Sequence, residues 1–278
     1  MSASNLRYRE SNDLRALLRH WREARGFSQL DLSLVAGISQ RQISFIESGR
    51  SVPGRQTLMN IAQSLDVPLR ERNALLLSAG YAPMYSEAEW SDKEMSVVMG
   101  AATRMLQQHE PFPAIVMDRY WNVLLTNPAT PDFFSCFIDM AARTGPRNIL
   151  HLMFDPQGMR PHIADWESVA LSLIQRVHRE AVGHVIDART QQLLDALLAY
   201  PGVRPEWRSQ AMAASSSTLP VVPLSFVKDG AALNYFSMIT TVGTPSTVAA
   251  QELRIECMFP ADSETEARHI ALLQAARE

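Results

Sequence analysis

The stretch from Ser28 to Gly49 constrains the fold more than any other part of the sequence. Ser28 precedes Asp31 by three positions and Ser39 precedes Gln42 by three, which is the spacing of a capping box at a helix start. Gly37 stands between the two signals and supplies the permissive backbone that a tight turn needs. The sequence therefore predicts two short helices joined by a tight turn, the second running from Gln40 to about Glu47.

Helical periodicity continues on both sides of this pair. A preceding helix carries apolar residues at helical spacing and ends at Gly26. Two more helices follow, and the second of these closes near Gly80. These segments predict a five-helix unit over residues 1–82. The helix after Ser28 has its apolar face at Leu30, Leu34 and Val35. The apolar positions of the first, fourth and fifth helices are Leu14, Leu17, Leu18, Trp21, Leu58, Ile61, Ala62, Leu65, Leu69, Ala74, Leu75 and Leu76.

The helix that starts at Gln40 has few apolar positions. Ile43 and Ile46 face one side, while Gln40, Arg41 and Ser44 face the other. The major groove of DNA admits one α-helix, and Gln or Arg side chains can make paired hydrogen bonds to adenine or guanine edges there. The N-terminus of the preceding helix, at Ser28 and Gln29, favours a DNA phosphate. Two helices, a glycine turn and a capped reading helix indicate a helix-turn-helix.

The run "ARGFSQLDLSLVAGISQRQISFIESGRSVPGRQTLMNIAQSLDVP" resembles the XRE (Cro-like, phage-repressor) helix-turn-helix family. The resemblance implies that Gln40, Arg41 and Phe45 lie where bases are contacted, with Ser44 beside them. It also implies that Gln29, Ser39, Arg50 and Arg55 lie where phosphates are held. Ser28 is a further phosphate candidate because it stands at the N-terminus of the same helix as Gln29. The alternative interpretation of each arginine is a solvated surface charge.

Charge is unevenly distributed along the 278 residues, a length that favours two domains. Residues 1–82 hold 11 Arg, no Lys and 7 acidic residues, a balance of +4. The remaining residues hold 15 basic and 22 acidic side chains, a balance of −7. The basic N-terminal part is therefore the one expected to bind a polyanion.

The sequence pattern changes after a linker and connecting helix over residues 83–110, whose buried face is expected at Val97, Val98, Ala101 and Met105. "AIVMDRYWNVLLTN" contains two short strands, and Asp229-Gly230 is a strong hairpin signal between two β-rich runs. "ELRIECMF" alternates with Leu253, Ile255, Cys257 and Phe259 on one side and Glu252, Arg254 and Glu256 on the other. An α+β fold is predicted, in which a five-stranded antiparallel sheet has helices over one face.

Residues 111–278, together with the lead-in "SQLDLSLVAG...RERNALLLSAGYAP", resemble the MmyB-like transcription regulators. The resemblance implies a PAS-like domain that binds a fatty-acid-like or similar apolar molecule. Aromatic and methionine side chains suit such a cavity, although they suit a filled core as well. Three polar residues could receive a carboxylate head group, and one of them, Asn127, also fits a helix cap. The candidate pocket residues are Arg119, Asn127, Phe133, Phe134, Phe137, His151, Met153, Phe154, Trp166, Phe236 and Met238.

Other classes of protein have little support in the sequence. No GxSxG, HExxH, P-loop or GxGxxG motif is present, so no enzyme is expected. Cys136 and Cys257 stand alone, so neither a metal site nor a disulfide framework is expected, and no cofactor is required. A haem-binding variant stays open because one histidine would suffice. The polar N-terminus and the lack of a long apolar segment predict a cytoplasmic protein without a membrane partner.

These features lead to two hypotheses. In the first, a homodimer binds double-stranded DNA sequence-specifically as a transcription regulator and responds to a small apolar ligand. In the second, the C-terminal domain of the DNA-binding regulator serves only dimerisation or protein docking, without a ligand.

Overall fold

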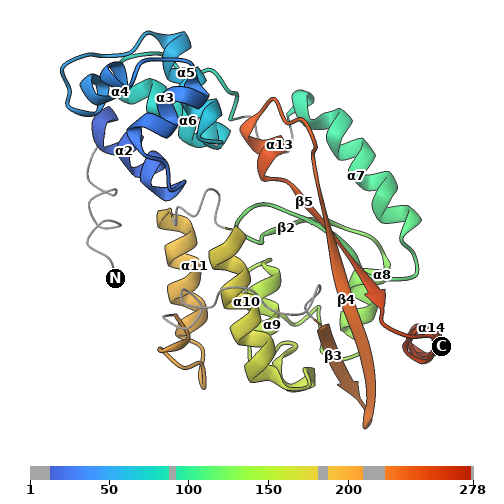
Figure 1. Cartoon of the computed structure of the whole chain (residues 1–278). Coiled ribbons are helices and arrows are strands. Elements are labelled where there is room, and N and C mark those ends of the chain that lie inside the picture. The colour runs from blue at the N-terminus through green and yellow to red at the C-terminus, as the bar shows by residue number, and fades with distance from the viewer. Residues whose placement is uncertain (1–12, 88–91, 181–186, 209–222, 277–278) are drawn as a thin grey trace. The chain divides into compact units, whose positions relative to one another are not determined.

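The computed structural model of the protein describes residues 13–87, 92–180, 187–208 and 223–276 (Figure 1). The chain divides into two compact units. Of the described residues, 13–87 and 245–251 form the first unit and the others form the second. Each unit is described separately below.

The first unit begins with five helices, as the sequence predicts. Asp13 caps the first helix by accepting a hydrogen bond from the Arg15 amide at 3.1 Å, and Gly37 ends the second at φ 65°. The bounds are Leu14–Ala24 (α2), Gln29–Ala36 (α3), Gln40–Glu47 (α4), Arg55–Ser64 (α5) and Leu69–Ser78 (α6).

The buried face of α3 differs from the predicted one. Leu30, Leu34 and Val35 are 52%, 74% and 55% exposed, whereas Leu32 and Ala36 are buried. Both sets form apolar stripes at helical spacing, so periodicity in an eight-residue helix does not decide between them. Burial of the second stripe is possible because Ser33, which lies beside it, donates its hydroxyl to the Leu30 carbonyl at 2.7 Å.

A segment from late in the chain packs into the first unit. Residues 245–251 contain most of helix α13 (Val248–Glu252). The Val248 amide donates to the Ser86 carbonyl at 2.9 Å, and the Leu69 amide donates to Oε1 of Gln251 at 2.8 Å. The predicted C-terminal domain over residues 111–278 includes this segment, because no helical periodicity marks so short an insertion.

The second unit is built on a five-stranded antiparallel sheet with the order β2-β1-β5-β4-β3. Asp229 and Gly230, at φ 50° and 77°, form the predicted hairpin turn between β3 and β4. The sheet and its helices confirm the α+β prediction. The strand bounds are Ala114–Met117 (β1), Val123–Thr126 (β2), Pro223–Lys228 (β3), Ala231–Thr241 (β4) and Arg254–Pro260 (β5).

The helices of the second unit surround this sheet. Two short 3-10 turns, Lys93–Met95 (η1) and Arg160–His162 (η2), precede α7 and α10. The helix bounds are Ser96–Gln108 (α7), Ala129–Ser135 (α8), Ile149–Phe154 (α9), Trp166–Glu180 (α10), Ala188–Leu198 (α11) and Ser263–Ala275 (α14).

Helices cover both faces of the sheet, so the prediction of a single covered face was wrong. Ile115 and Met117 of β1 pack into the larger core with α8 to α11, whereas Ala114 and Val116 pack against α7 (Figure 1). Four consecutive apolar residues in β1 are the mark of a strand buried on both sides.

The face that α7 turns to the sheet also differs from the predicted one. Ala102 and Leu106 are buried, whereas Val97 and Met105 are 80% and 37% exposed. The buried stripe begins one position later than the sequence pattern suggested.

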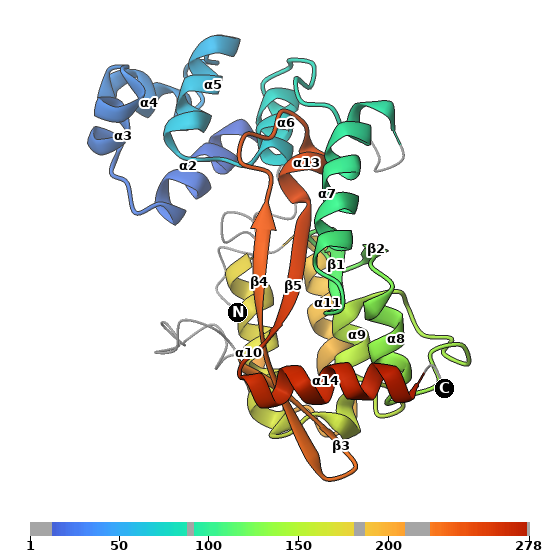
Figure 2. The same ribbon diagram turned by 90° about the vertical axis from the view of Figure 1, so that its right-hand side faces the viewer.

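Helix α14 packs on β4, β5 and α8 and contributes a buried polar link (Figure 2). Nε2 of His269 lies 2.8 Å from the Pro111 carbonyl, so this nitrogen carries the hydrogen and donates. Nδ1 of His269 then accepts from the Tyr235 hydroxyl at 2.8 Å.

None of the described helices has both the length and the hydropathy that crossing a membrane requires.

Candidate functional site

Helix α4 is positioned by its cap and by two buried isoleucines. The Ser39 hydroxyl accepts from the Gln42 amide at 3.2 Å, which is the first half of the predicted capping box. The reciprocal bond is present only in α3, where Asp31 accepts from the Ser28 amide at 2.9 Å. Ile43 and Ile46 are each 2% exposed and attach α4 to the core of the first unit. The opposite side of α4 is therefore left to solvent.

The outward side of α4 carries the residues that the sequence analysis assigned to base contacts. Gln40 and Arg41 are exposed, and Ser44 and Phe45 are half-buried. The guanidinium carbon of Arg41 lies 5.1 Å from the centre of the Phe45 ring, and that of Arg50 lies 5.6 Å from the same ring. The aromatic ring is thus in contact range of two cations.

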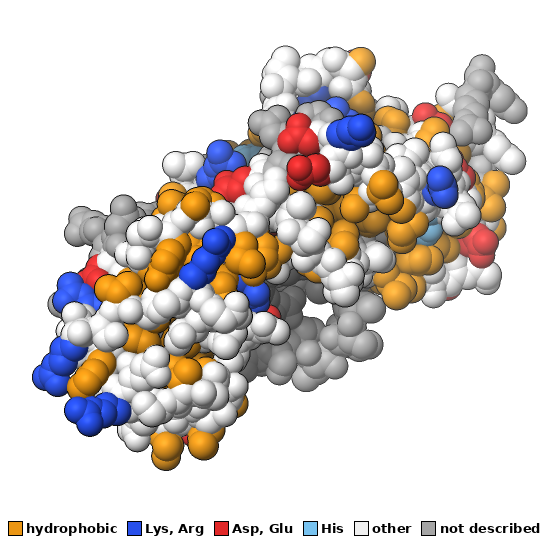
Figure 3. Space-filling model, turned by 90° about the horizontal axis from the view of Figure 1, so that it is seen from above, with side chains coloured by type: hydrophobic (Ala, Val, Ile, Leu, Met, Phe, Trp, Pro, Cys, Tyr) orange, Lys and Arg blue, Asp and Glu red, His pale blue; other side chains and the backbone are white. Residues whose placement is uncertain are grey.

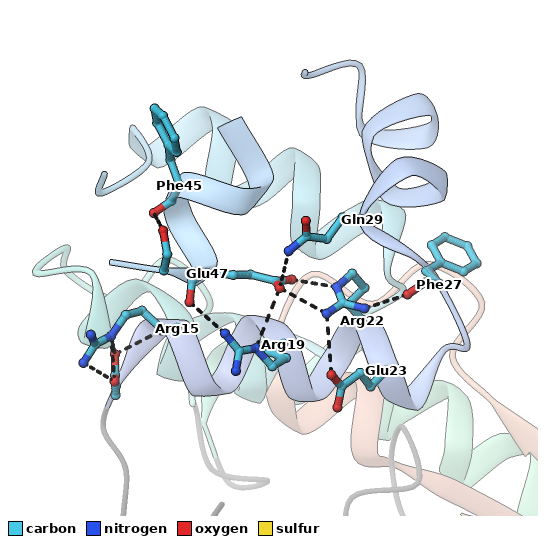
Figure 4. Close-up of polar contacts among 10 residues, drawn as sticks. Arg15, Arg19, Arg22, Glu23, Phe27, Gln29, Phe45 and Glu47 are labelled. Atoms are coloured by element: carbon cyan, nitrogen blue, oxygen red, sulfur yellow. Dashed lines mark hydrogen bonds and ion pairs between the residues drawn. The ribbon is translucent and has the colours of Figure 1, made fainter. Parts of the chain in front are cut away.

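Glu47, at the end of α4, joins three helices from inside (Figure 4). Its carboxylate accepts from Nε and Nη2 of Arg22 at 2.7 and 3.0 Å and from Nε2 of Gln29 at 3.0 Å. Arg19 donates to the Glu47 carbonyl at 3.1 Å. This network fixes the orientation of α4 relative to α2 and α3, and it engages the side-chain amide of Gln29.

Three arginines around α4 differ from the others of the first unit. Within the described chain, the side chains of Arg41, Arg50 and Arg55 form no ion pair or hydrogen bond, and all three residues are exposed. In contrast, Arg22 is paired with Glu47, and Arg25 donates to the Leu65 and Asp66 carbonyls. In Figure 3, arginine side chains stand out from this unit with hydrophobic side chains between them. The uncompensated positive charge is thus concentrated beside the exposed side of α4.

The second unit contains an apolar pocket between the sheet and helices α8 to α10. The pocket encloses about 610 Å³, including the open space at its mouth. Aliphatic and aromatic side chains form most of its wall, among them Ile115, Trp121, Phe134, Met153, Leu173, Leu224, Tyr235, Phe236 and Met258.

An ion pair forms the charged part of this wall. Nη1 and Nη2 of Arg176 donate to the Glu256 carboxylate at 3.0 and 3.2 Å. The guanidinium carbon of Arg176 also lies 4.4 Å from the centre of the Trp121 ring. Both charges are compensated within the wall, so the pocket presents little net charge to its contents.

Comparison with known families identifies both units. Residues 98–272, more than half of the chain, match the model of the MmyB-like transcription regulator ligand binding domain. The chain belongs to this MmyB-like family. Residues 18–72 match the model of the helix-turn-helix family. The protein therefore combines a helix-turn-helix with an MmyB-like ligand-binding domain, as both resemblances implied.

Comparisons with individual proteins add little to this family assignment. No curated protein matches the MmyB-like chain. Among solved structures, an RNA-binding light-oxygen-voltage receptor is similar at 14% identity with a TM-score of 0.29. That match covers 94% of this chain and 63% of the receptor, so the chain spans less than two thirds of its length. A likeness this low supports no statement about fold or function, and the PAS-like description stays a prediction.

The apolar residues predicted for the MmyB-like pocket fall into three environments. Phe134, Met153 and Phe236 line the pocket. Met238 is 57% exposed on β4. The remaining side chains belong to the packed core, with Trp166 half-buried at its edge: Phe133, Phe137, Phe154 and Trp166.

The polar residues predicted to receive a head group are engaged elsewhere in the second unit. Arg119 is paired with Asp187 at 3.0 Å and with Glu252 at 3.1 Å. Asn127 is buried and accepts from the Ala114 amide at 3.0 Å and the Thr130 hydroxyl at 2.8 Å. Nδ1 of His151 lies 2.9 Å from the Tyr200 hydroxyl, and burial lowers the pKa of His151. None of the three is part of the wall of the pocket described above.

Sequence reasoning missed Arg176 and Glu256. The alternation in "ELRIECMF" assigned Glu256 to the polar side, and that side is the one that faces α10 and the pocket. Met258 and Glu256 lie on the same face of β5, and Met258 lines the pocket too. An apolar residue two positions from a glutamate was the available signal.

For cofactors, the described residues contain no group of three or more His, Cys, Asp or Glu side chains arranged to hold a metal ion.

Proposed function

We propose that this MmyB-like protein is a transcription regulator that binds double-stranded DNA as a homodimer and responds to a fatty-acid-like ligand in its apolar pocket. The observation that carries the DNA-binding part is the cluster of exposed, uncompensated arginines beside a capped helix, Arg41, Arg50 and Arg55. The ligand-binding part rests on the apolar pocket of the second unit.

Helix α4 supplies the groups that sequence-specific recognition requires. Gln40 and Arg41 are at its exposed start, and Gln and Arg are the side chains that form paired hydrogen bonds with adenine and guanine. Ser44 and Phe45 lie beside them, and Phe45 offers an apolar surface to a thymine methyl group or a sugar.

Phosphate contacts would surround this base-reading group. Ser28 and Ser39 cap the two helices of the motif, and the backbone amides that remain free at a helix N-terminus favour a phosphate. Arg50 and Arg55 add two exposed charges. Gln29 would act through its backbone, because Glu47 engages its side chain.

A homodimer follows from the size of the reading surface. One reading helix contacts too few base pairs for useful specificity, and two-fold symmetry doubles the contacts on a palindromic site.

The pocket suits a flexible apolar chain. Its lining is almost wholly apolar, and its one ion pair is internally compensated. An alkyl chain gains from such a wall in proportion to the apolar surface that it buries.

The DNA-binding proposal is tested by selecting binding sites from a random DNA library with the full-length protein. We expect a palindromic consensus. The Arg41→Ala variant should lose about 1–3 kcal/mol on that consensus and relax preference at one position in each half-site. Arg204→Ala is the matched control, because Arg204 is exposed in the second unit and paired with Glu167 at 2.6 Å. Absence of any enriched sequence would refute the proposal.

The ligand proposal is tested by native mass spectrometry of the gently purified protein. We expect added mass equal to a fatty acid, released on denaturation and absent from Leu173→Trp, which fills the pocket. A tight dimer that neither carries added mass nor takes up an added fatty acid would favour the alternative, in which the C-terminal domain serves dimerisation or docking alone.

A further inference from the structure

A second pocket adjoins the first one and has a different character. It encloses about 590 Å³, open space included, and it is bordered by β1, β2, α8, α9 and the residues that lead into α9. Ile115, Phe134 and Ile149 belong to the walls of both pockets. The second pocket also has two arginines in its wall, Arg143 and Arg147. The three shared side chains thus lie between the apolar pocket and the pocket that has a cationic wall.

Arg143 is largely buried, with 13% of its side chain exposed. Its Nη1 donates to the Pro146 carbonyl at 3.2 Å. Its Nε and Nη2 are buried and have no hydrogen-bond partner within the described part of the chain. Nε and Nη2 form one edge of the guanidinium fork, so the two unsatisfied N–H groups point in parallel. A side-on carboxylate is the group that accepts from both at once.

The surroundings of Arg143 leave this edge incompletely compensated. Oδ2 of Asp155 lies 3.6 Å from Nη2, which is close enough for attraction and too far for a hydrogen bond. His151 is held neutral at physiological pH, because burial, and then the Arg143 charge, lower its pKa. Leaving charged N–H groups buried without acceptors is unfavourable, so an acceptor that reaches them is bound strongly.

The chain holds the guanidinium in place instead of letting it turn to solvent. Gly145 permits close approach, since a Cβ at this position would lie 3.0 Å from Nη2 of Arg143. The turn before it is fixed by Asp139, whose Oδ1 accepts from the Ala141 and Ala142 amides at 3.0 and 3.1 Å. The Nε and Nη2 edge is therefore preorganised, which lowers the entropic cost of binding an anion.

We propose that the Nε and Nη2 edge of Arg143 receives the carboxylate of an amphiphilic carboxylic acid, whose apolar chain passes along Ile115, Phe134 and Ile149 into the first pocket. The inference rests on the proposed apolar ligand and names the site of its head group. It moves that site away from Arg119, which already has two carboxylate partners. Arg176 is equally unsuited, because Glu256 occupies both of its terminal nitrogens.

Isothermal titration of the delipidated full-length protein with two probes of equal chain length, dodecanoate and 1-dodecanol, tests this proposal. In the wild type we expect dodecanoate to bind more tightly than the alcohol. Arg143→Gln should weaken dodecanoate roughly 10- to 100-fold and leave dodecanol within about two-fold, because only the acid uses the fork. Arg143→Lys should weaken dodecanoate by an intermediate factor, since lysine keeps the charge and loses the parallel donors.

Two controls locate the effect. Arg147→Gln, at an exposed arginine of the same pocket, should change dodecanoate affinity by less than about three-fold. Leu173→Trp should weaken both probes, because it fills the apolar pocket that they share. Dodecanol binding by Arg143→Gln also shows that this variant is folded.

The outcomes separate the inference from the proposed function. If both probes bind the wild type and Arg143→Gln equally well, the head group lies elsewhere and the Arg143 inference is overturned, while the apolar pocket stands. Equal weakening of both probes in Arg143→Gln would also overturn it, since the residue would then be structural. If neither probe binds the wild type, the fatty-acid-like ligand and the Arg143 site are both refuted.

Discussion

The guanidinium carbon of Arg41 lies 5.1 Å from the centre of the Phe45 ring on the exposed side of α4. Arg50, which follows the helix, lies 5.6 Å from the same ring. Two flexible cations are thereby held beside one rigid aromatic side chain, one at the start of the helix and one beyond its end. Phe45 can therefore support the polar exposed side of α4 through the two arginines as well as through its own apolar contacts.

Replacing Phe45 should therefore weaken DNA binding through the arginines. Each exposed cation–π contact contributes about 0.5–1 kcal/mol, so Phe45→Ala should lose about 1–2 kcal/mol on the selected site. Phe45→Leu keeps the apolar contact and removes the ring face, and we expect it to lose most of the same free energy. Fluorescence anisotropy with the selected duplex measures both. Full affinity in Phe45→Leu would show that only apolar contact matters.

Arg50 should behave differently from Arg41. It is exposed, lies outside α4 and is expected to contact a phosphate. Arg50→Ala should weaken binding to the selected site and to random DNA by the same factor and reduce the slope of log K against log salt by about 1. Titrations at several salt concentrations on both duplexes test this. A loss confined to the selected site would instead identify Arg50 as a base-reading residue.

Glu47 should be important for the stability of the first unit. Its side chain is 2% exposed and that of Arg22 is 12% exposed, so removing the carboxylate leaves a nearly buried cation. Glu47→Ala should lower the free energy of unfolding by about 3–5 kcal/mol. Arg15→Ala removes a pair whose side chains are 53% and 36% exposed, and it should cost much less than Glu47→Ala because solvent screens the pair. Urea unfolding of the two variants gives the comparison, and equal losses would contradict the assignment.

The first unit could be predicted closely because its signals are local. Caps at Ser28 and Ser39 and the positive-φ glycine at position 37 fix where helices begin and end, and α4 runs from Gln40 to Glu47 as predicted. The exposed side of α4 could be predicted too, since Ile43 and Ile46 are its two aliphatic residues and lie on the opposite side. The role of Gln29 could not, because its contact with Glu47 joins residues 18 positions apart.

The sheet was predictable because its signals are local, whereas the pocket was not because it depends on contacts between distant elements. Strand identity depends on alternation and turn residues, which are visible at Asp229 and Gly230. Pocket walls depend on which strand face meets which helix, and β1 is apolar on both faces. The sequence therefore could not show that Phe133 would pack in the core and Phe134 would line the cavity.

The hydrogen bonds of His269 predict a pH dependence of stability in the second unit. Burial lowers the pKa of His269 from its ordinary 6.5, and the bond to the Pro111 carbonyl opposes this less strongly. Above about pH 6.5 the imidazole is neutral in both the folded and the unfolded chain, so its contribution is fully present. Below that pH the unfolded chain binds the proton first, and the free energy of unfolding falls until the folded-state pKa is reached.

Urea unfolding of the wild type at pH 7.5, 6.5 and 5.5 should show this decline. His269→Gln should show a shallower decline and a lower stability at pH 7.5. The remaining slope in the variant is expected from His151 and His178 of the same unit, whose pKa values burial also lowers. An unchanged slope in His269→Gln would mean that the imidazole of His269 takes up a proton in the folded protein as readily as in the unfolded chain.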